Sequence, residues 1–189
     1  MSADLSGGAA GPGPRGASRF APGGGFVLRR VHRPDSALLR ELEAYDMAAF
    51  GPTGLRTYDL AVMAEAGAVF VAYLEDEVVG GCQLVRMLDE PGYFYVVGLY
   101  VREPWRGRRF GGELLRLVAA ESRALGAEGL VLTVAPDNAA ALALYEAAGF
   151  VRERFVSAFY GENEDRLILR WRFPDRQGPT REGGLPGSV

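Results

Sequence analysis

The chain has one cysteine and one histidine among its 189 residues. The single cysteine, Cys82, excludes an internal disulfide, a redox thiol pair and a multi-cysteine zinc site. The single histidine, His32, excludes a histidine metal cluster. It lies just before Arg33 and Pro34 at a predicted strand end, which favours a surface role. We therefore expect no bound metal.

Long apolar runs and a strong charge of one sign are also missing. The longest apolar run, residues 93–101, is roughly nine residues and too short to span a bilayer. No charged-then-apolar leader opens the chain. The net charge of −3 gives no field that would hold nucleic acid or an anionic membrane. We expect a cytoplasmic protein that binds neither, with the oligomeric state left open, a homodimer included.

Composition divides the chain into three parts. Residues 1–25 are rich in Gly, Pro, Ala and Ser and have almost no large apolar side chains, so we expect a flexible tail there. Residues 174–189 have the same character. The chain as a whole is 48% hydrophobic and 24% charged, which suits one α/β domain over residues 26–173.

The most informative segment runs from residue 99 to residue 115. An apolar strand stops at Pro104, and a turn with Arg106, Arg108 and Arg109 leads into a helix. The P-loop and dinucleotide-binding patterns are both absent. Free N–H groups and the dipole at a helix start favour an anion, while glycines allow close approach and arginines bind phosphate. This arginine-glycine loop (residues 104–112) predicts a phosphate or pyrophosphate site; the alternative is a solvated arginine turn.

A second segment, residues 130–150, gives a more specific signal. A buried-type strand ends at Pro136, Asp137 or Asn138 caps a helix, and Gly149 ends it. The spacing matches the pattern N-x-x-A-x-x-L-Y-E-x-x-G-F at Asn138, Ala141, Leu144, Tyr145, Glu146, Gly149 and Phe150. With Arg106 and Gly111 of the arginine-glycine loop, the chain resembles the GNAT superfamily of N-acetyltransferases over about residues 26–173.

Local sequence signals give an alternating order of elements. The resemblance implies that they form the GNAT fold, a mixed and mostly antiparallel sheet of about seven strands flanked by about four helices. We expect strands at 26–31, 68–74, 78–88, 93–101, 130–134, 151–160 and 166–173, and helices at 36–50, 58–66, 109–125 and 138–149.

The resemblance implies acetyl-CoA as cosubstrate. Backbone groups of Leu99, Tyr100 and Val101 would hold the pantetheine arm, and one N–H would polarise the thioester carbonyl. Asn138 would lie near the same arm. The pyrophosphate would contact residues of the loop and helix start, namely Arg106, Gly107, Arg108, Arg109, Phe110, Gly111 and Gly112. Arg109 replaces the family's usual central glycine, and a positive φ there would cost roughly 1 kcal/mol.

Tyr145 is the predicted general acid, because its reference pKa of about 10 keeps it protonated at neutral pH. The alternative is a core tyrosine on the buried face of its helix. No general base is identified. The closing segment, residues 160–166, looks like that of ribosomal-protein alanine N-acetyltransferases, but Thr133 stands where they carry a catalytic glutamate. The acidic side chains nearby are candidates by location only, or solvated loop charges: Glu162, Glu164 and Asp165.

The sequence therefore predicts an acetyl-CoA-dependent N-acetyltransferase that acts on a primary amine, with a small-molecule acceptor favoured. Two alternatives stay open. One is the same chemistry on a protein or peptide N-terminus. The other is an acyl-CoA-binding regulator without turnover.

Overall fold

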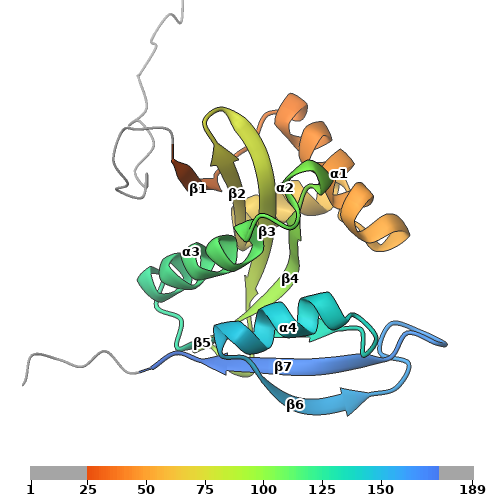
Figure 1. The fold of residues 1–189 in the computed structure, drawn as a ribbon. Coiled ribbons are helices and arrows are strands. Elements are labelled where there is room, and N and C mark those ends of the chain that lie inside the picture. The colour runs from red at the N-terminus through yellow and green to blue at the C-terminus, as the bar shows by residue number, and fades with distance from the viewer. Residues whose placement is uncertain (1–24, 175–189) are drawn as a thin grey trace, which may run out of the picture.

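A computed structural model describes residues 25–174 of the chain. The predicted tails lie outside the described residues, apart from residues 25 and 174. Seven strands form one sheet in the order β1-β2-β3-β4-β5-β7-β6 (Figure 1). Every neighbouring pair is antiparallel except β4–β5. The strands are β1 (Phe26–Val31), β2 (Ala68–Leu74), β3 (Glu77–Arg86), β4 (Tyr93–Val101), β5 (Gly129–Val134), β6 (Val151–Val156) and β7 (Arg166–Arg172).

Four α-helices and two short 3₁₀ turns complete the described part of the chain. They are α1 (Ser36–Phe50), η1 (Gly51–Thr53), α2 (Thr57–Ala66), η2 (Glu103–Trp105), α3 (Phe110–Ala124) and α4 (Ala139–Ala148). Side-chain caps fix two of the helix starts, because Asp35 accepts hydrogen bonds from the N–H groups of Ala37 and Leu38, and Asn138 accepts one from Ala141. The predicted GNAT architecture is confirmed.

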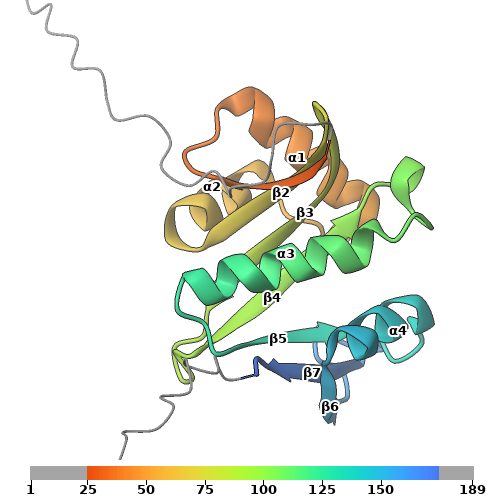
Figure 2. The same cartoon turned by 60° about the vertical axis from the view of Figure 1, so that its left-hand side comes forward.

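The helices lie on both faces of the sheet, so the molecule has two cores (Figures 1 and 2). On one face α3 and α4 pack against the strands, with Leu114 and Leu132 among the buried side chains. On the other face α1 and α2 cover only the β1–β4 half, with Leu42 and Val71 in that core. Alternation along each strand therefore assigns every strand residue to one of the two faces.

Two predicted strands were too long. We expected a strand over 151–160, but β6 ends at Val156. The carboxylate of Asp165 accepts hydrogen bonds from the Ser157 hydroxyl and the Ala158 N–H, and this folds the chain into a turn. We also expected a strand over 78–88, but β3 ends at Arg86. The chain turns there because the Met87 N–H donates to the Tyr93 carbonyl oxygen at 3.0 Å.

The most consequential irregularity is a bulge in β4. Gln83 of β3 pairs with Gly98, whereas the next residue, Leu84, pairs with Val96. Val97 is therefore an extra residue in β4, and such a bulge bends and twists its strand. The parallel pairing of β4 with β5 stops at the same level, at Val96 and Leu132. Beyond it the two strands diverge toward their carboxyl ends and leave a gap in the sheet (Figure 2).

Candidate active site

The gap between β4 and β5 exposes unpaired backbone groups. The Arg102 N–H donates to the Val79 carbonyl oxygen of β3 at 2.9 Å. Peptide groups in an antiparallel pair alternate in direction, so Leu99 and Val101 turn theirs away from β3 and into the gap. Tyr100 lies between them, but its peptide group faces β3, where it pairs with Gly81. Two of the three predicted pantetheine-binding residues therefore offer backbone groups to the gap.

The arginine-glycine loop lies at the carboxyl end of β4 and opens α3. Gly107 and Arg109 both have a positive φ, at 74° and 66°, so Arg109 adopts the strained left-handed conformation that the sequence analysis considered. The first N–H groups of α3, from Phe110 to Gly112, have no intrahelical partner. A Cβ added to Gly111 would come no closer than 3.4 Å to any other residue. Packing among the described residues therefore does not require glycine there.

The predicted phosphate-binding arginines contact backbone and aromatic groups of the described residues rather than carboxylates. Arg106 donates from its Nε to the Val101 carbonyl oxygen at 3.0 Å, and the guanidinium of Arg108 lies 5.4 Å from the centre of the Trp105 ring. Within residues 25–174, neither these two side chains nor Arg109 forms an ion pair. Their positive charge and the start of α3 together favour an anion at this end of the gap.

Tyr145 lies on the α3–α4 side of the sheet. Its side chain is 8% exposed and packs against Phe150, with 5.5 Å between the ring centres. Burial, with a smaller contribution from the nearby Cys82 thiol, raises the pKa of Tyr145. Cys82 is opposite Leu99 in the sheet, so the phenol lies near the free edge of β4. Its hydroxyl has no hydrogen-bond partner in the described part of the chain and stays protonated at neutral pH.

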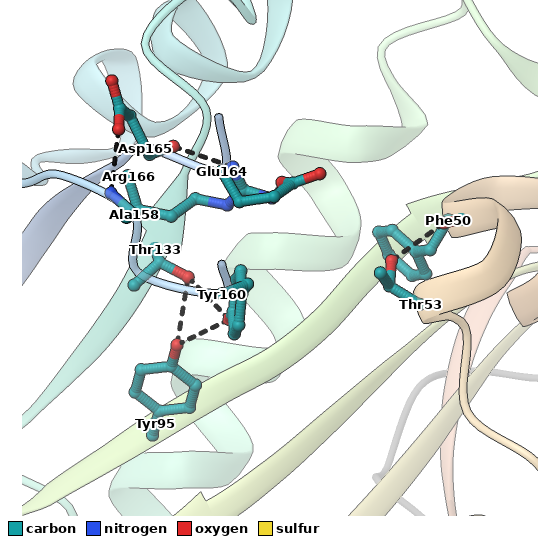
Figure 3. Close-up of polar contacts among 9 residues, drawn as sticks. All are labelled: Phe50, Thr53, Tyr95, Thr133, Ala158, Tyr160, Glu164, Asp165 and Arg166. Atoms are coloured by element: carbon teal, nitrogen blue, oxygen red, sulfur yellow. Dashed lines mark hydrogen bonds and ion pairs between the residues drawn. The ribbon is translucent and has the colours of Figure 1, made fainter. Parts of the chain in front are cut away.

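Three hydroxyl groups meet on the other face of the sheet (Figure 3). The hydroxyl oxygen of Tyr95 is 3.0 Å from that of Thr133, and the Tyr160 hydroxyl is 3.2 Å from Thr133 and 3.4 Å from Tyr95. Burial is the main cause that raises the pKa of Tyr95 to about 12. We call these three residues the hydroxyl cluster. Thr133 is one residue beyond the last β4–β5 pair, Val96 with Leu132, and Tyr95 is one residue before it, so the cluster lies where the gap opens.

Tyr95 was not predicted as a site residue, and Thr133 was identified only as the residue that replaces a glutamate. A signal was present, because alternation from the buried residues Val96 and Leu132 places Tyr95 and Thr133 on the same face of adjacent strands. Tyr160 could not be found in this way, since it comes from the loop between β6 and β7.

The candidate bases of that loop are mostly engaged in local contacts. Asp165 holds the start of the loop through Ser157 and Ala158. Glu164 forms an ion pair with Arg166 at 2.6 Å, and the Arg166 guanidinium lies 4.9 Å from the centre of the Tyr160 ring. Glu162 is exposed. The first two carboxylates thus shape the loop that presents Tyr160.

A cleft of about 250 Å³ lies beside Tyr95, on the part of the sheet face that α1 and α2 leave uncovered. Its charged groups are partly balanced, because Arg170 pairs with Glu90 at 2.8 Å and with Glu153 at 3.1 Å. Arg154 and four apolar or aromatic side chains complete the lining, the four being Met87, Val131, Phe159 and Ile168. The cleft could take the body of a small amine.

Comparison with known proteins identifies the family. The sequence profile of the Acetyltransferase (GNAT) family matches residues 36–150. The chain belongs to this family. Membership confirms the predicted enzyme class, an acyltransferase that uses acetyl-CoA.

Individual relatives differ in what they are named for. An IAA acetyltransferase of Azospirillum brasilense is 29% identical over 132 residues, which cover 70% of this chain and 86% of that protein. The N-alpha-acetyltransferase MAK3 of Arabidopsis thaliana is 29% identical over 130 residues, 68% of each protein. The two relatives are named for different acceptors, so the comparison does not decide between a small-molecule acceptor and a peptide N-terminus.

Solved structures support the same fold. The ribosomal-protein-S18-alanine N-acetyltransferase of Escherichia coli aligns with a TM-score of 0.66 and 18% identity, covering 80% of this chain and 97% of that one. NAA60 of Arabidopsis thaliana, solved in complex with acetyl-CoA, aligns with a TM-score of 0.67 and 18% identity, covering 79% and 100%. At this identity the likeness concerns the fold alone.

No helix within residues 25–174 has the length and apolarity to cross a membrane. No three His, Cys, Asp or Glu side chains of the same range gather where they could hold a metal ion.

Proposed function

We propose that this chain transfers the acetyl group of acetyl-CoA to the primary amine of a small molecule. The observation that carries the proposal is the gap between β4 and β5. It has the start of α3 at one end, Tyr145 on one face and the hydroxyl cluster on the other. The start of α3 suits the anionic part of the coenzyme. Tyr145 can act as the general acid, and the hydroxyl cluster can bind the amine acceptor.

The proposed site divides the reaction among these groups. The first N–H groups of α3 and the arginines of the loop bind the pyrophosphate, and the peptide groups of Leu99 and Val101 hold the pantetheine arm. The neutral amine attacks the thioester carbon, a C–N bond forms and the C–S bond breaks. Tyr145 gives its proton to the departing sulfur, since a thiol with a pKa near 8.5 is a better leaving group when protonated. The amine proton leaves through the hydroxyl cluster to solvent, and Tyr145 regains a proton from solvent before the next turnover.

The hydroxyl cluster also bears on the choice of acceptor. It offers neutral hydrogen-bonding groups and no carboxylate, so it can orient an amine but cannot take its proton strongly. An acceptor that is already partly neutral at pH 7 suits such a site. The cleft beside Tyr95 has the volume of a small ligand, which favours a small molecule. Peptide N-termini also have low pKa values, near 7.7–8.0, and are the second candidate.

The test is a screen for thiol release. Purified protein is mixed with acetyl-CoA and a panel of small amines and short peptides, and free CoA is measured against a reaction without acceptor. The chain contains no lysine, so no side-chain amine of the enzyme competes as acceptor. We expect at least one small amine to give acceptor-dependent release. Release with peptides alone would favour the N-terminal alternative, and coenzyme binding without any release would favour the non-catalytic regulator.

Two further predictions belong with this proposal, and the oligomeric state is left open. The roles of Tyr145 and Asn138 in catalysis and coenzyme binding are assigned from the resemblance and their position. A cytoplasmic location, with no nucleic acid or membrane as partner, is predicted from the sequence. A homodimer is left open, and sedimentation of the purified chain would decide it.

A further inference from the structure

Two polar side chains are fully buried between α1 and β3. Asp46 of α1 and Gln83 of β3 are each 1% exposed. The Gln83 Nε2 donates to one carboxylate oxygen of Asp46 at 3.0 Å, and the Leu55 N–H donates to the other at 2.7 Å. Asp46 therefore ties together β3 and the α1–α2 connection (residues 51–56).

Gln83 lies directly over the β4 bulge. It is opposite Gly98, the residue that follows the extra Val97. A Cβ added to Gly98 would come within 2.7 Å of the Gln83 Oε1 and 3.1 Å of the Phe50 ring. The same Oε1 is buried and has no hydrogen-bond partner within the described residues. The amide is held in this place by the bond from its nitrogen to Asp46.

The bulge is part of the proposed site, and the residue before the α1–α2 connection, Phe50, packs against β4 beside it, with its ring 6.2 Å from that of Tyr100. The bulge directs the peptide groups of Leu99 and Val101 into the gap. The α1–α2 connection begins at the end of α1, where Figure 3 draws Phe50 and Thr53 across from the hydroxyl cluster. The Asp46 carboxylate thus contacts two segments. One is Gln83, which lies over the β4 bulge on the coenzyme side, and the other is the α1–α2 connection, on the side where we place the acceptor.

We propose that Asp46 and Gln83 are positioning residues for acetyl transfer, and this inference rests on the proposed function. Through Gln83, Asp46 fixes Gly98 and with it the direction of the Leu99 peptide group. Through the Leu55 N–H it fixes the α1–α2 connection against β4. Neither side chain touches the reacting atoms.

Stability alone gives a weak reason for this arrangement. Burying a carboxylate costs free energy, and burial raises the pKa of Asp46 despite its two hydrogen bonds. Buried polar groups can often be replaced by apolar ones of similar volume without loss of stability. What an apolar pair would not reproduce is the directed contact to both Gln83 and Leu55.

The test uses a broken pair and a reversed pair. In Asp46→Asn, the new amide can still accept from Leu55, but its nitrogen meets a hydrogen-bond acceptor only if the Gln83 amide turns over, which places the Gln83 nitrogen against Gly98 in place of Oε1. In the double variant Asp46→Asn/Gln83→Glu, the amide nitrogen at position 46 donates to the carboxylate at position 83, so this contact returns with reversed polarity while the contact from the Leu55 N–H is kept. Asp59→Asn is the matched control, because Asp59 also accepts from a backbone N–H of this region, that of Arg56 at 3.0 Å.

We expect Asp46→Asn to lower kcat by about 10- to 100-fold, the scale of a misplaced reacting group, and to raise the acceptor KM. The dissociation constant of acetyl-CoA, held mainly by the arginine-glycine loop, changes little. The double variant recovers most of kcat, and Asp59→Asn keeps the wild-type value. Urea unfolding of each variant shows that the folded protein is being assayed.

Three results would overturn the inference. They are a folded Asp46→Asn variant with wild-type kcat and KM, a folded double variant that is no better than the single one, and a loss in kcat that Asp59→Asn reproduces. If Asp46→Asn does not fold, the same comparison is made between wild type and the double variant, and a folded double variant below about a tenth of wild-type kcat also overturns it. Wild type that binds no acetyl-CoA and releases no thiol defeats the proposed function instead.

Discussion

The guanidinium of Arg106 closes on the strand that precedes it, with its Nε 3.0 Å from the carbonyl oxygen of Val101. That carbonyl is the last backbone group that β4 turns into the gap. The arginine that we expect to bind phosphate therefore occupies a group that we expect to hold the pantetheine arm. On binding, the coenzyme would replace this internal contact, and the arginine would be released toward the pyrophosphate.

The first prediction concerns the arginines of the loop. Arg106→Ala and Arg108→Ala should each weaken acetyl-CoA binding by about 1.5–3 kcal/mol, roughly 10- to 150-fold, if each loses a charged hydrogen bond to phosphate. Titration calorimetry at two salt concentrations measures this, and the losses shrink at high salt. Arg116→Ala is the control, because Arg116 pairs with Glu113 on the surface of α3. Equal affinity in all three variants would contradict the phosphate role.

The second prediction concerns the backbone at Arg109. At φ 66° the left-handed conformation costs free energy for a residue with a Cβ, whereas it does not for glycine. We expect Arg109→Gly to be more stable to urea than Arg109→Ala by about 1 kcal/mol. Both variants lose the charge, so both should bind acetyl-CoA more weakly than wild type. Equal stability of the two variants would show that the strain is relieved elsewhere.

The third prediction concerns Tyr145. Tyr145→Phe keeps the packing against Phe150 and removes a hydroxyl that has no hydrogen-bond partner within residues 25–174. We expect stability and coenzyme affinity to change little and kcat to fall roughly 10- to 1,000-fold, within the range of general acid catalysis. Steady-state kinetics with saturating acetyl-CoA gives the answer. Unchanged turnover would make this tyrosine a core residue only.

The fourth prediction concerns pH. The raised pKa values of Tyr145 and of Tyr95, the latter about 12, mean that both phenols stay protonated well above pH 9. A rise in kcat/KM between about pH 7 and 9 would therefore report loss of a proton from the amine. An amine with a pKa of 7.8 is about 14% neutral at pH 7, and one of 10.4 about 0.04%. We expect low-pKa amines to be better substrates by up to a few hundred-fold, about 3.5 kcal/mol.

A substitution in the hydroxyl cluster extends this test. Thr133→Glu places a carboxylate where the amine proton leaves. It should therefore raise kcat/KM for high-pKa amines more than for low-pKa ones, and flatten the pH profile of kcat/KM. Thr133→Val, which removes only the hydroxyl, should lower kcat/KM for both classes. A flat profile in wild type with a good high-pKa substrate would reveal a base that these residues do not provide.

Much of this molecule could be predicted because its signals are local. The cap at Asn138, the end at Gly149 and the spacing of Tyr145 between them each act within a few residues, so α4 and its place in the family follow from sequence. The hydroxyl cluster could not be assembled in this way. Tyr160 meets Thr133 only because Asp165 shortens β6 and turns the loop back over the sheet.

The bulge at Val97 was invisible for a different reason. Its effect lies in the main chain, where a register shift against Gln83 redirects peptide groups without requiring a particular side chain at position 97. The buried pair of Asp46 and Gln83 was missed as well, because the two residues are far apart in sequence and each is ordinary in its own segment.

The short ladder between β4 and β5 has a mechanical consequence. Strand pairing between the two halves of the sheet is limited to Tyr93–Val96 and Gly129–Leu132. The halves can therefore move relative to each other by local opening at this short ladder. A coenzyme bound in the gap would contact both strands and restrict this motion. We expect amide exchange along both strands to slow together when acetyl-CoA binds, so that the ligand stiffens the very sheet whose incompleteness admits it.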